Sequence, residues 1–249
     1  HVFQEIAEIA RSKFPRIVFP EGEHPKIQEA AVILSRRHLA HPILLGNEDK
    51  LIKELHKQGL RNGDFSVIDP EKSHDFEKFC QNFTLSRESK GMTLEKAKEL
   101  FKNCPTYYGS MMVQEGKADT LLSGMNSTYP EAIRPALQII DKQEGVERVY
   151  GLYLMIKGEH VLIFADTTVH IQPTAKQLCE VALLCSSVAK NLQMSPRVAM
   201  LSFSQLGHVE HPEGDLMKQA TQLVREKDPS IPIIGEVQAN FAVSKDLVN

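Results

Sequence analysis

The sequence lacks the long apolar segments and charge excess that mark membrane and nucleic-acid-binding proteins. No apolar run approaches the roughly 20 residues that a membrane-spanning helix requires. No signal peptide opens the sequence, so we expect a cytoplasmic protein without a membrane partner. The net charge of −3 provides no general attraction to nucleic acid, which we also do not expect as a partner.

Several motifs of familiar chemistry are absent as well. There is neither a GxxxxGK[ST] loop nor a strand-linked GxGxxG, so NTP hydrolysis or dinucleotide binding by these routes has no support. The segment LSFSQLG at 201–207 does not match the GxSxG elbow of serine hydrolases. The four cysteines form no CxxC pair, which favours reduced thiols in an intracellular protein: Cys80, Cys104, Cys179 and Cys185.

The 249 residues contain alternating short apolar strands and amphipathic helices, which predict a mostly parallel, doubly wound α/β sheet. The composition changes near Asp141, where DKQEGVER is charged and turn-like. Beyond it, two β runs flank Lys157-Gly158, a pattern typical of a hairpin. We therefore expect two α/β domains, residues 1–141 and 142–249. The second is expected to lack its C-terminal closing segment, because no final strand and helix follow GEVQANFAV.

The stretch from Ala118 to Ile140 reads as a strand, a polar turn and a helix whose apolar face contains Ile133, Leu137 and Ile140. Such a junction can present backbone N–H groups to an anion, and Arg134 adds a fork suited to phosphate or carboxylate. Because Arg134 precedes Pro135, the regular helix is expected to begin near Pro135. The alternative is a capped junction whose arginine pairs with a nearby carboxylate, and both interpretations remain open.

Two polar loops of the first half carry further candidates. The segment PEGEHPK at 20–26 contains Glu21, Glu23 and His24, whose side chains could bind a metal or act as an acid–base pair. Acidic residues are also common at the start of a helix, and this structural interpretation is preferred. The basic loop SRESKG at 86–91 suits a phosphate, but a solvated connector is favoured. The Met-rich helix at 107–115 is interpreted as core.

Three loops of the second half follow strands or begin helices. Asp166, Thr167 and Thr168 are expected to bind a ligand, and His170 nearby is more often a loop residue than a catalytic one. The hydroxyls of Ser202 and Ser204 suit a phosphate or a pantetheine chain. The group around 208–215 resembles a metal cluster but lacks HExxH spacing and contains a proline, so a polar helix start is favoured over a metal site: His208, His211, Glu213 and Asp215.

With these loops assembled, the sequence resembles the phosphate acetyltransferase (phosphotransacetylase) family. It looks most like the C-terminal phosphotransacetylase-like domain of bacterial NADP-dependent malic enzymes. The segments that carry the resemblance lie in order along nearly the whole sequence: RIVFPEGEHPKI, HPILLGNEDKL, SRESKGMTLEKA, LLSGMNSTYPEAIRPALQII, VLIFADTTVHIQPTA and RVAMLSFSQLG.

The resemblance implies an isocitrate/isopropylmalate dehydrogenase-like fold of two doubly wound domains, with acetyl-CoA or CoA bound in the cleft between them. It also implies a homo-oligomer formed through the second domain. In the family, the CoA thiol attacks acetyl phosphate while arginines hold the phosphate, and two of these map onto Arg87 and Arg134. The expected ligand-binding residues are Arg87, Asn126, Ser127, Thr128, Arg134, Asp166, Thr167, Thr168, Ser202 and Ser204.

Two departures from the family shape the functional prediction. The family's catalytic serine, arginine and aspartate lie in a C-terminal segment outside these residues. The usual DGE-x-Q-x-D pattern appears as IGEVQAN, with Ile234 and Asn240 in place of both aspartates. We therefore predict a regulatory domain of a malic enzyme that binds acetyl-CoA without catalytic residues or a cofactor of its own. NADP and a divalent metal are expected only in an attached malic domain. The alternatives are a phosphate acetyltransferase and a structural dimerisation module.

Overall fold

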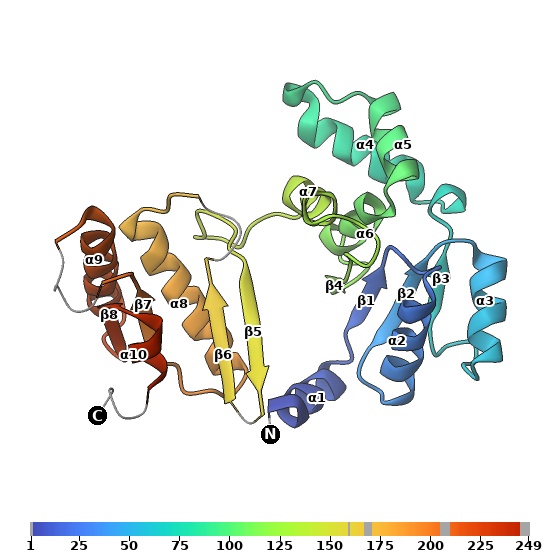
Figure 1. The fold of residues 1–249 in the computed structure, drawn as a ribbon. Coiled ribbons are helices and arrows are strands. Elements are labelled where there is room, and N and C mark those ends of the chain that lie inside the picture. Colours follow the sequence, from blue (N-terminus) through green and yellow to red (C-terminus); the bar gives the residue numbers. More distant parts are fainter. Residues whose placement is uncertain (1, 159, 167–170, 205–209, 245–249) are drawn as a thin grey trace. The chain divides into compact units, whose positions relative to one another are not determined.

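The computed structural model describes all residues except 1, 159, 167–170, 205–209 and 245–249 (Figure 1). The chain divides into two compact units. The first unit comprises residues 7–141, and the second comprises residues 142–249 together with 1–6. The boundary near the N-terminus falls inside helix α1 (Val2–Lys13).

A four-stranded parallel sheet organises the first unit. Its strands β1 (Arg16–Phe19), β2 (His41–Leu45), β3 (Ser66–Ile68) and β4 (Thr120–Leu121) lie in the order β3-β2-β1-β4. Side chains of a strand alternate between its two faces, so each face builds its own core. The predicted parallel α/β fold is confirmed here.

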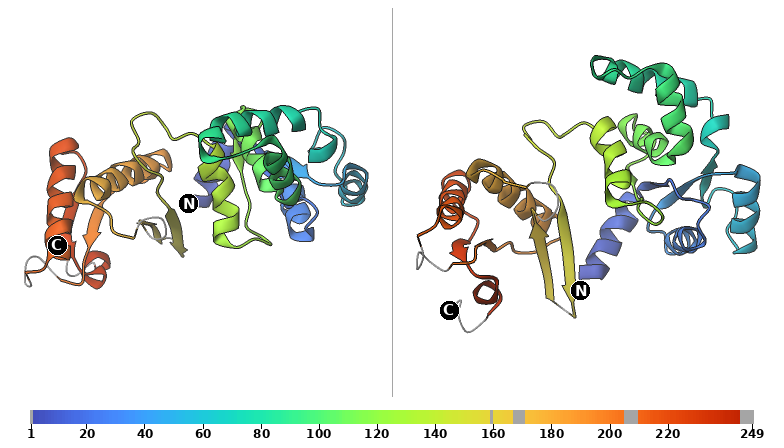
Figure 2. Two further views of the ribbon diagram at one scale, coloured as in Figure 1. Left: turned by 90° about the horizontal axis from the view of Figure 1, so that it is seen from above. Right: turned by 45° about the horizontal axis from the view of Figure 1, so that its top comes forward.

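Helices cover both faces of this sheet. On one face, Phe19 and Leu44 pack in a cluster with residues of α2 (Pro25–Arg36) and α3 (Glu48–Lys57). On the other face, Val18, Ile43 and Leu45 pack against a second set of helices (Figure 2). This alternation explains why RIVF and HPILL read as continuous apolar runs: a parallel strand covered on both sides has no polar face.

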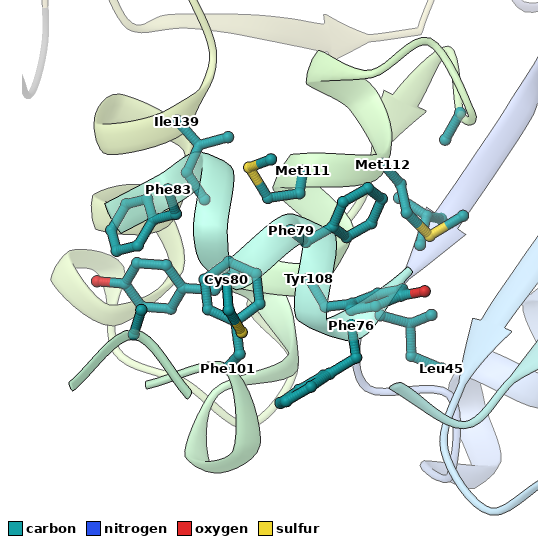
Figure 3. Packing of buried hydrophobic residues seen from close by; sticks show 14 of the residues in the cluster. Leu45, Phe76, Phe79, Cys80, Phe83, Phe101, Tyr108, Met111, Met112 and Ile139 are labelled. Atoms are coloured by element: carbon teal, nitrogen blue, oxygen red, sulfur yellow. The ribbon is translucent and has the colours of Figure 1, made fainter. Parts of the chain in front are cut away.

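The second set of helices is α4 (Phe76–Arg87), α5 (Leu94–Asn103) and α6 (Pro105–Gln114), with the short 3₁₀ turn η1 (Pro70–Lys72) before α4 and η2 (Glu88–Lys90) between α4 and α5. Its core is aromatic (Figure 3). The rings of Phe83 and Phe101 lie 5.6 Å apart, and those of Phe79 and Tyr108 lie 5.0 Å apart. Aromatic pairs at such distances add to the free energy of area burial, so this cluster is a rigid base for α6 and for α7 beside it.

Helix α7 (Tyr129–Ile139) differs from the prediction, because it begins six residues before Pro135 and contains Arg134 in its interior. Thr128 caps it through a capping box with Glu131, and this fixes the start. The restriction that a proline places on its predecessor is outweighed by this cap and by the burial of Pro135 itself. The apolar face was also wrong in part, because Leu137 is 48% exposed while Pro135 and Ile139 are buried.

The second unit contains an antiparallel hairpin of β5 (Leu152–Lys157) and β6 (His160–Ala165), which confirms the predicted hairpin. Helices α8 (Ala175–Asn191) and α9 (Pro212–Lys227) pack with the parallel pair β7 (Val198–Leu201) and β8 (Ile233–Val237), and α10 (Ala239–Val243) follows. The described residues of this unit therefore form a parallel pair and a separate hairpin, instead of the single doubly wound sheet that we expected.

Candidate functional site

The loop from Ser123 to Thr128 and the turn after β1 meet at one edge of the first unit's sheet. β1 and β4 are neighbouring parallel strands, so their carboxyl ends lie side by side, where α/β proteins commonly bind ligands. The carboxylate of Glu21 accepts hydrogen bonds from three successive backbone N–H groups of the loop. The distances are 3.0 Å from Gly124 and 3.1 Å from Met125, both to Oε2, and 2.7 Å from Asn126 to Oε1.

The predicted anion cradle therefore exists, and in this structure it holds a carboxylate of the chain itself. Burial tends to raise the pKa of Glu21, but the hydrogen bonds from Asn126, Met125 and Gly124 outweigh it and hold the pKa below its usual value. The next donor is also used, because Thr128 donates its N–H to Glu131 Oε2 at 2.8 Å. The backbone donors of Asn126 and Thr128 thus contact carboxylates, while a ligand role for Asn126, Ser127 and Thr128 stays a prediction.

The charges of Arg87 and Arg134 both act on Tyr107. Arg87 is the half-buried last residue of α4, and Arg134 lies on the exposed side of α7. Burial raises the pKa of Tyr107, whereas the positive charges of Arg134 and Arg87 act to lower it. The hydroxyl itself donates to Gln138 Oε1 at 3.0 Å. Helices α4, α6 and α7 thereby bring together two arginines that are 47 positions apart in the numbering, Arg87 and Arg134.

Neither guanidinium forms a hydrogen bond or an ion pair with another described residue. The alternative interpretation is met in part: the junction is capped by Thr128 and Glu131, and hydrogen bonds from Thr128, helped by the charge of Arg134, lower the pKa of Glu131, although the side chains of Arg134 and Glu131 form no hydrogen-bonded ion pair. Glu131, one turn before Arg134, is bonded instead to the backbone and hydroxyl of Thr128. Two cations without a fixed partner, next to one phenol, form a site that suits a phosphate or a carboxylate.

The other candidates in PEGEHPK have structural partners, as the preferred interpretation held. The carboxylate of Glu23 accepts from the backbone of Asn47 at 3.0 Å and from Lys50 Nζ at 2.6 Å, so it joins the turn to the start of α3. His24 is the N-cap of α2, and its Nδ1 accepts from the N–H of Lys26 at 3.2 Å. These contacts fix the turn from which Glu21 extends.

In the second unit, Asp166 directly follows β6 and adopts a positive φ of 55°, with its N–H bonded to Gly151 O at 3.2 Å. Ser202 Oγ accepts from the N–H of Ser204 at 3.4 Å. The buried Ser204 hydroxyl donates in turn to Glu236 Oε1 at 3.4 Å. The structure thus joins Ser202 and Ser204, while Thr167, Thr168 and His170 lie outside the described residues.

The metal-like group at 208–215 is only partly described, because His208 lies in the undescribed segment 205–209. His211 is the N-cap of α9, and its Nδ1 accepts from the N–H of Glu213 at 3.2 Å. Among the residues with described positions, no group of three His, Cys, Asp or Glu side chains is arranged to hold a metal ion. Nor does any helix in the described ranges combine the length and apolar composition that a membrane crossing requires.

Sequence reasoning did not identify Tyr107 and Gln138 as neighbours of the arginines. Periodicity places Tyr107 in a core helix, which is correct for its ring, since the residue is 5% exposed. Its hydroxyl nevertheless reaches Gln138 on α7. A buried tyrosine needs a partner for its hydroxyl, and that requirement is the signal that points to a polar neighbour.

Comparison with known proteins identifies the family. The family model described as "Phosphate acetyl/butaryl transferase" matches residues 1–249. Phosphate acetyltransferase from Thermoanaerobacterium thermosaccharolyticum is 38% identical over 99% of this chain and 76% of that protein. Among solved structures, a phosphotransacetylase from Streptococcus pyogenes superposes with a TM-score of 0.88 at 34% identity, covering 98% of this chain and 74% of that one. The EutD phosphotransacetylase from Staphylococcus aureus superposes with a TM-score of 0.84 at 33% identity, and the match covers 99% of this chain and 75% of that one.

These matches correct the predicted function. The relatives that cover almost the whole chain are named phosphate acetyltransferases, and no malic enzyme domain is indicated by them. The predicted role as an allosteric, acetyl-CoA-sensing part of an NADP-dependent oxidoreductase is therefore wrong. The chain belongs to the phosphate acetyl/butaryl transferase family.

Proposed function

We propose that this protein exchanges an acetyl group between CoA and phosphate. Besides the family, the observation that carries this proposal is a pair of cations, Arg87 and Arg134, whose charges both act on Tyr107. Both guanidiniums lack a bonded partner within the described ranges, so they are available to an anion. Acetyl phosphate and phosphate are the anions that such a pair suits.

The exchange is an acyl transfer in which charge moves onto phosphate. The CoA thiolate attacks the carbonyl carbon of acetyl phosphate, the carbon–sulfur bond forms, and the carbon–oxygen bond to phosphate breaks. The phosphate departs with the bonding electron pair, and the thiol proton ends on phosphate or in solvent. Arg87 and Arg134 are proposed to hold the phosphoryl group and to stabilise the charge that develops on its bridging oxygen.

The remaining predicted residues are proposed for binding the same two substrates. Asn126, Ser127 and Thr128 border the arginine site in sequence and are proposed to contact the phosphate or acetyl end. Asp166, Thr167 and Thr168 are proposed, together with Ser202 and Ser204, to bind CoA. Support comes from the places of Asp166 after β6 and of Ser202 and Ser204 after β7, and from the family resemblance of the segments that contain all five residues.

Initial rates of acetyl-CoA formation from acetyl phosphate and CoA, followed by thioester absorbance, test the function on the protein at its natural length. We expect Arg134→Gln and Arg87→Gln each to lower kcat/KM for acetyl phosphate by roughly a hundredfold, the order reported for removing one electrostatic donor. Arg61→Gln is the matched control, because Arg61 is an exposed arginine of the same unit with no recorded side-chain partner in the described chain. No thioester formation by the unaltered protein would refute the proposal.

We further propose that the protein forms a homo-oligomer through the second unit. Four apolar side chains on one face of the hairpin support this, since they pair across β5 and β6 and are 44–48% exposed: Tyr153, Met155, Leu162 and Phe164. Met155→Lys should lower the molar mass measured by light scattering. The same change at Ile171, which is 98% exposed and off the hairpin, should not. An unchanged mass in Met155→Lys would count against this interface.

A further inference from the structure

We infer that Glu21 is a positioning residue for Arg134, acting through the loop that begins α7. The inference rests on the proposed function, because it concerns the arginine that holds phosphate. Glu21 does not touch that arginine. Its carboxylate is bonded to the segment 124–127, which leads directly into the helix that contains Arg134.

The contacts of Glu21 use both of its oxygens. Oε2 accepts from Gly124 and Met125, and Oε1 accepts from Asn126, with the hydroxyl of Ser127 3.5 Å from Oε1. Because the carboxylate is ionised, it forms stronger hydrogen bonds with these N–H groups than a neutral acceptor would. One side chain therefore fixes the backbone of a loop more than 100 residues further along the chain.

Glu21 has a rigid base from which to do this. It follows β1 and precedes Gly22, where an added Cβ would lie 2.6 Å from the carbonyl oxygen of Leu45. The turn is thus pressed against β2, and only glycine permits that approach. Glu23, on the other side of Gly22, is tied to Asn47 and Lys50. The carboxylate of Glu21 consequently extends from a turn that two strands hold.

The capping box fixes the residue at which α7 begins, and the Glu21 contacts are proposed to fix the direction of its first turn, because the side chains of that turn bury little. Residues 128–131 are exposed, and the buried residues of the helix, Pro135 and Ile139, come later. Arg134 lies between this exposed first turn and the buried Pro135. Loosening the first turn is proposed to change the direction of the helix at Arg134, and small misplacements of a binding group weaken its contact with a ligand strongly.

The competing interpretation is that the carboxylate of Glu21 occupies the binding site of the substrate phosphate. The two interpretations predict opposite effects. If Glu21 positions Arg134, removing its charge loosens α7 and weakens the binding of acetyl phosphate. If Glu21 blocks an anion site, removing its charge opens the cradle and tightens that binding. Both carboxylate oxygens of Glu21 already accept hydrogen bonds from the chain itself, which favours the interpretation of Glu21 as a positioning residue.

The test is steady-state kinetics of Glu21→Gln, which keeps the shape of the side chain and removes its charge. We expect KM for acetyl phosphate to rise by roughly five- to fiftyfold, with KM for CoA nearly unchanged. Glu54→Gln is the matched control, because it is the same change in the same unit at a half-exposed glutamate whose carboxylate accepts from Lys57 Nζ at 2.7 Å instead of from the 124–127 segment. It should leave both KM values within about twofold of the unaltered protein, as surface substitutions usually do. An unchanged or lowered KM for acetyl phosphate in Glu21→Gln overturns the inference.

A double substitution shows whether Glu21 acts through Arg134. If it does, Glu21→Gln combined with Arg134→Gln should be no slower than Arg134→Gln alone. Fully additive losses overturn the inference while leaving the proposed function intact. If Arg134→Gln itself has no effect, the proposed function fails instead. Circular dichroism and thermal melting accompany each variant, with Glu21→Asp as a charged second variant. Loss of the fold in both Glu21 variants also overturns the inference, since Glu21 would then be a stability residue.

Discussion

The aromatic cluster beneath α6 and α7 allows a prediction whose size follows from the structure. Phe101 on α5 is 1% exposed, and its ring lies 5.6 Å from that of Phe83, 5.7 Å from that of Tyr107 and 6.4 Å from that of Phe76. Phe101→Ala removes the ring from the centre of this cluster. The expected loss in the free energy of unfolding is about 3–5 kcal/mol, the usual cost of a buried Phe→Ala change with its residual cavity.

Two fully buried cysteines make the effect measurable in each unit separately. Cys80 lies in the same cluster as Phe101 (Figure 3), and Cys179 lies in the core of the second unit. Burial raises the pKa of Cys80 to about 11, so its thiol reacts only after the unit opens. With Cys104 and Cys185 replaced by serine, each unit keeps one such thiol. Labelling with a disulfide reagent in mild urea then reports the opening of either unit.

Phe101→Ala should accelerate the labelling of Cys80 by roughly a hundredfold to a few thousandfold, since each 1.4 kcal/mol is a factor of ten. The labelling of Cys179 should stay unchanged, because Phe101 contributes nothing to the second unit's core. Phe101→Leu is the control for a local opening beside Cys80, and we expect a much smaller acceleration from it. An unchanged rate at Cys80, or an equal acceleration at both thiols, would refute the reasoning.

Three further predictions concern the frame of the two units. Gly22→Ala places a Cβ 2.6 Å from Leu45 O, and overpacking of this kind should cost about 1–3 kcal/mol, measured by urea denaturation. Hydrogen bonds from Arg16 lower the pKa of Asp119 to about 2, from an ordinary value of 3.8. The stability this pair adds is thus present above about pH 4 and is lost as the pH falls toward 2. Because both side chains are half exposed, Asp119→Asn should cost less than about 1 kcal/mol at neutral pH, and its thermal melting should depend less on pH below 4. Thr174→Ala breaks the capping box of α8 and should lower the free energy of unfolding by about 1 kcal/mol.

Much of the fold was predictable because local patterns decide it. The apolar segments RIVF, PILL and SVI lie within the strands β1, β2 and β3, and Gly158 lies in the turn of the β5–β6 hairpin, directly after Lys157 at the end of β5. The start of α7 was missed for a physical reason. Pro135 was treated as a boundary, although the Thr128–Glu131 capping box is a stronger local signal and also stands in the sequence. Recognising that box would have placed Arg134 inside the helix.

The residue types of the candidate site could be predicted from the sequence, but not which of these residues contact each other. Glu21 and the loop at 123–128 were each identified as polar junctions after strands. That they meet follows from the adjacency of β1 and β4, which no local pattern encodes. The convergence of Arg87 and Arg134 on Tyr107 likewise depends on how α4, α6 and α7 pack. Sequence periodicity marks Tyr107 as core, and it carries no information about where a buried ring directs its hydroxyl.

The pairing of Glu21 with the 124–127 loop bears on how an anion is held at this sheet edge. If the backbone N–H groups of the loop had no partner, they could bind the same anion as the two arginines. Here the chain supplies its own carboxylates to the backbone donors: Glu21 to the loop and Glu131 to Thr128. The guanidiniums of Arg87 and Arg134, by contrast, have no such internal partner among the described residues. The backbone donors then serve to fix the loop, and the proposed function assigns the binding of phosphate to the two side-chain cations.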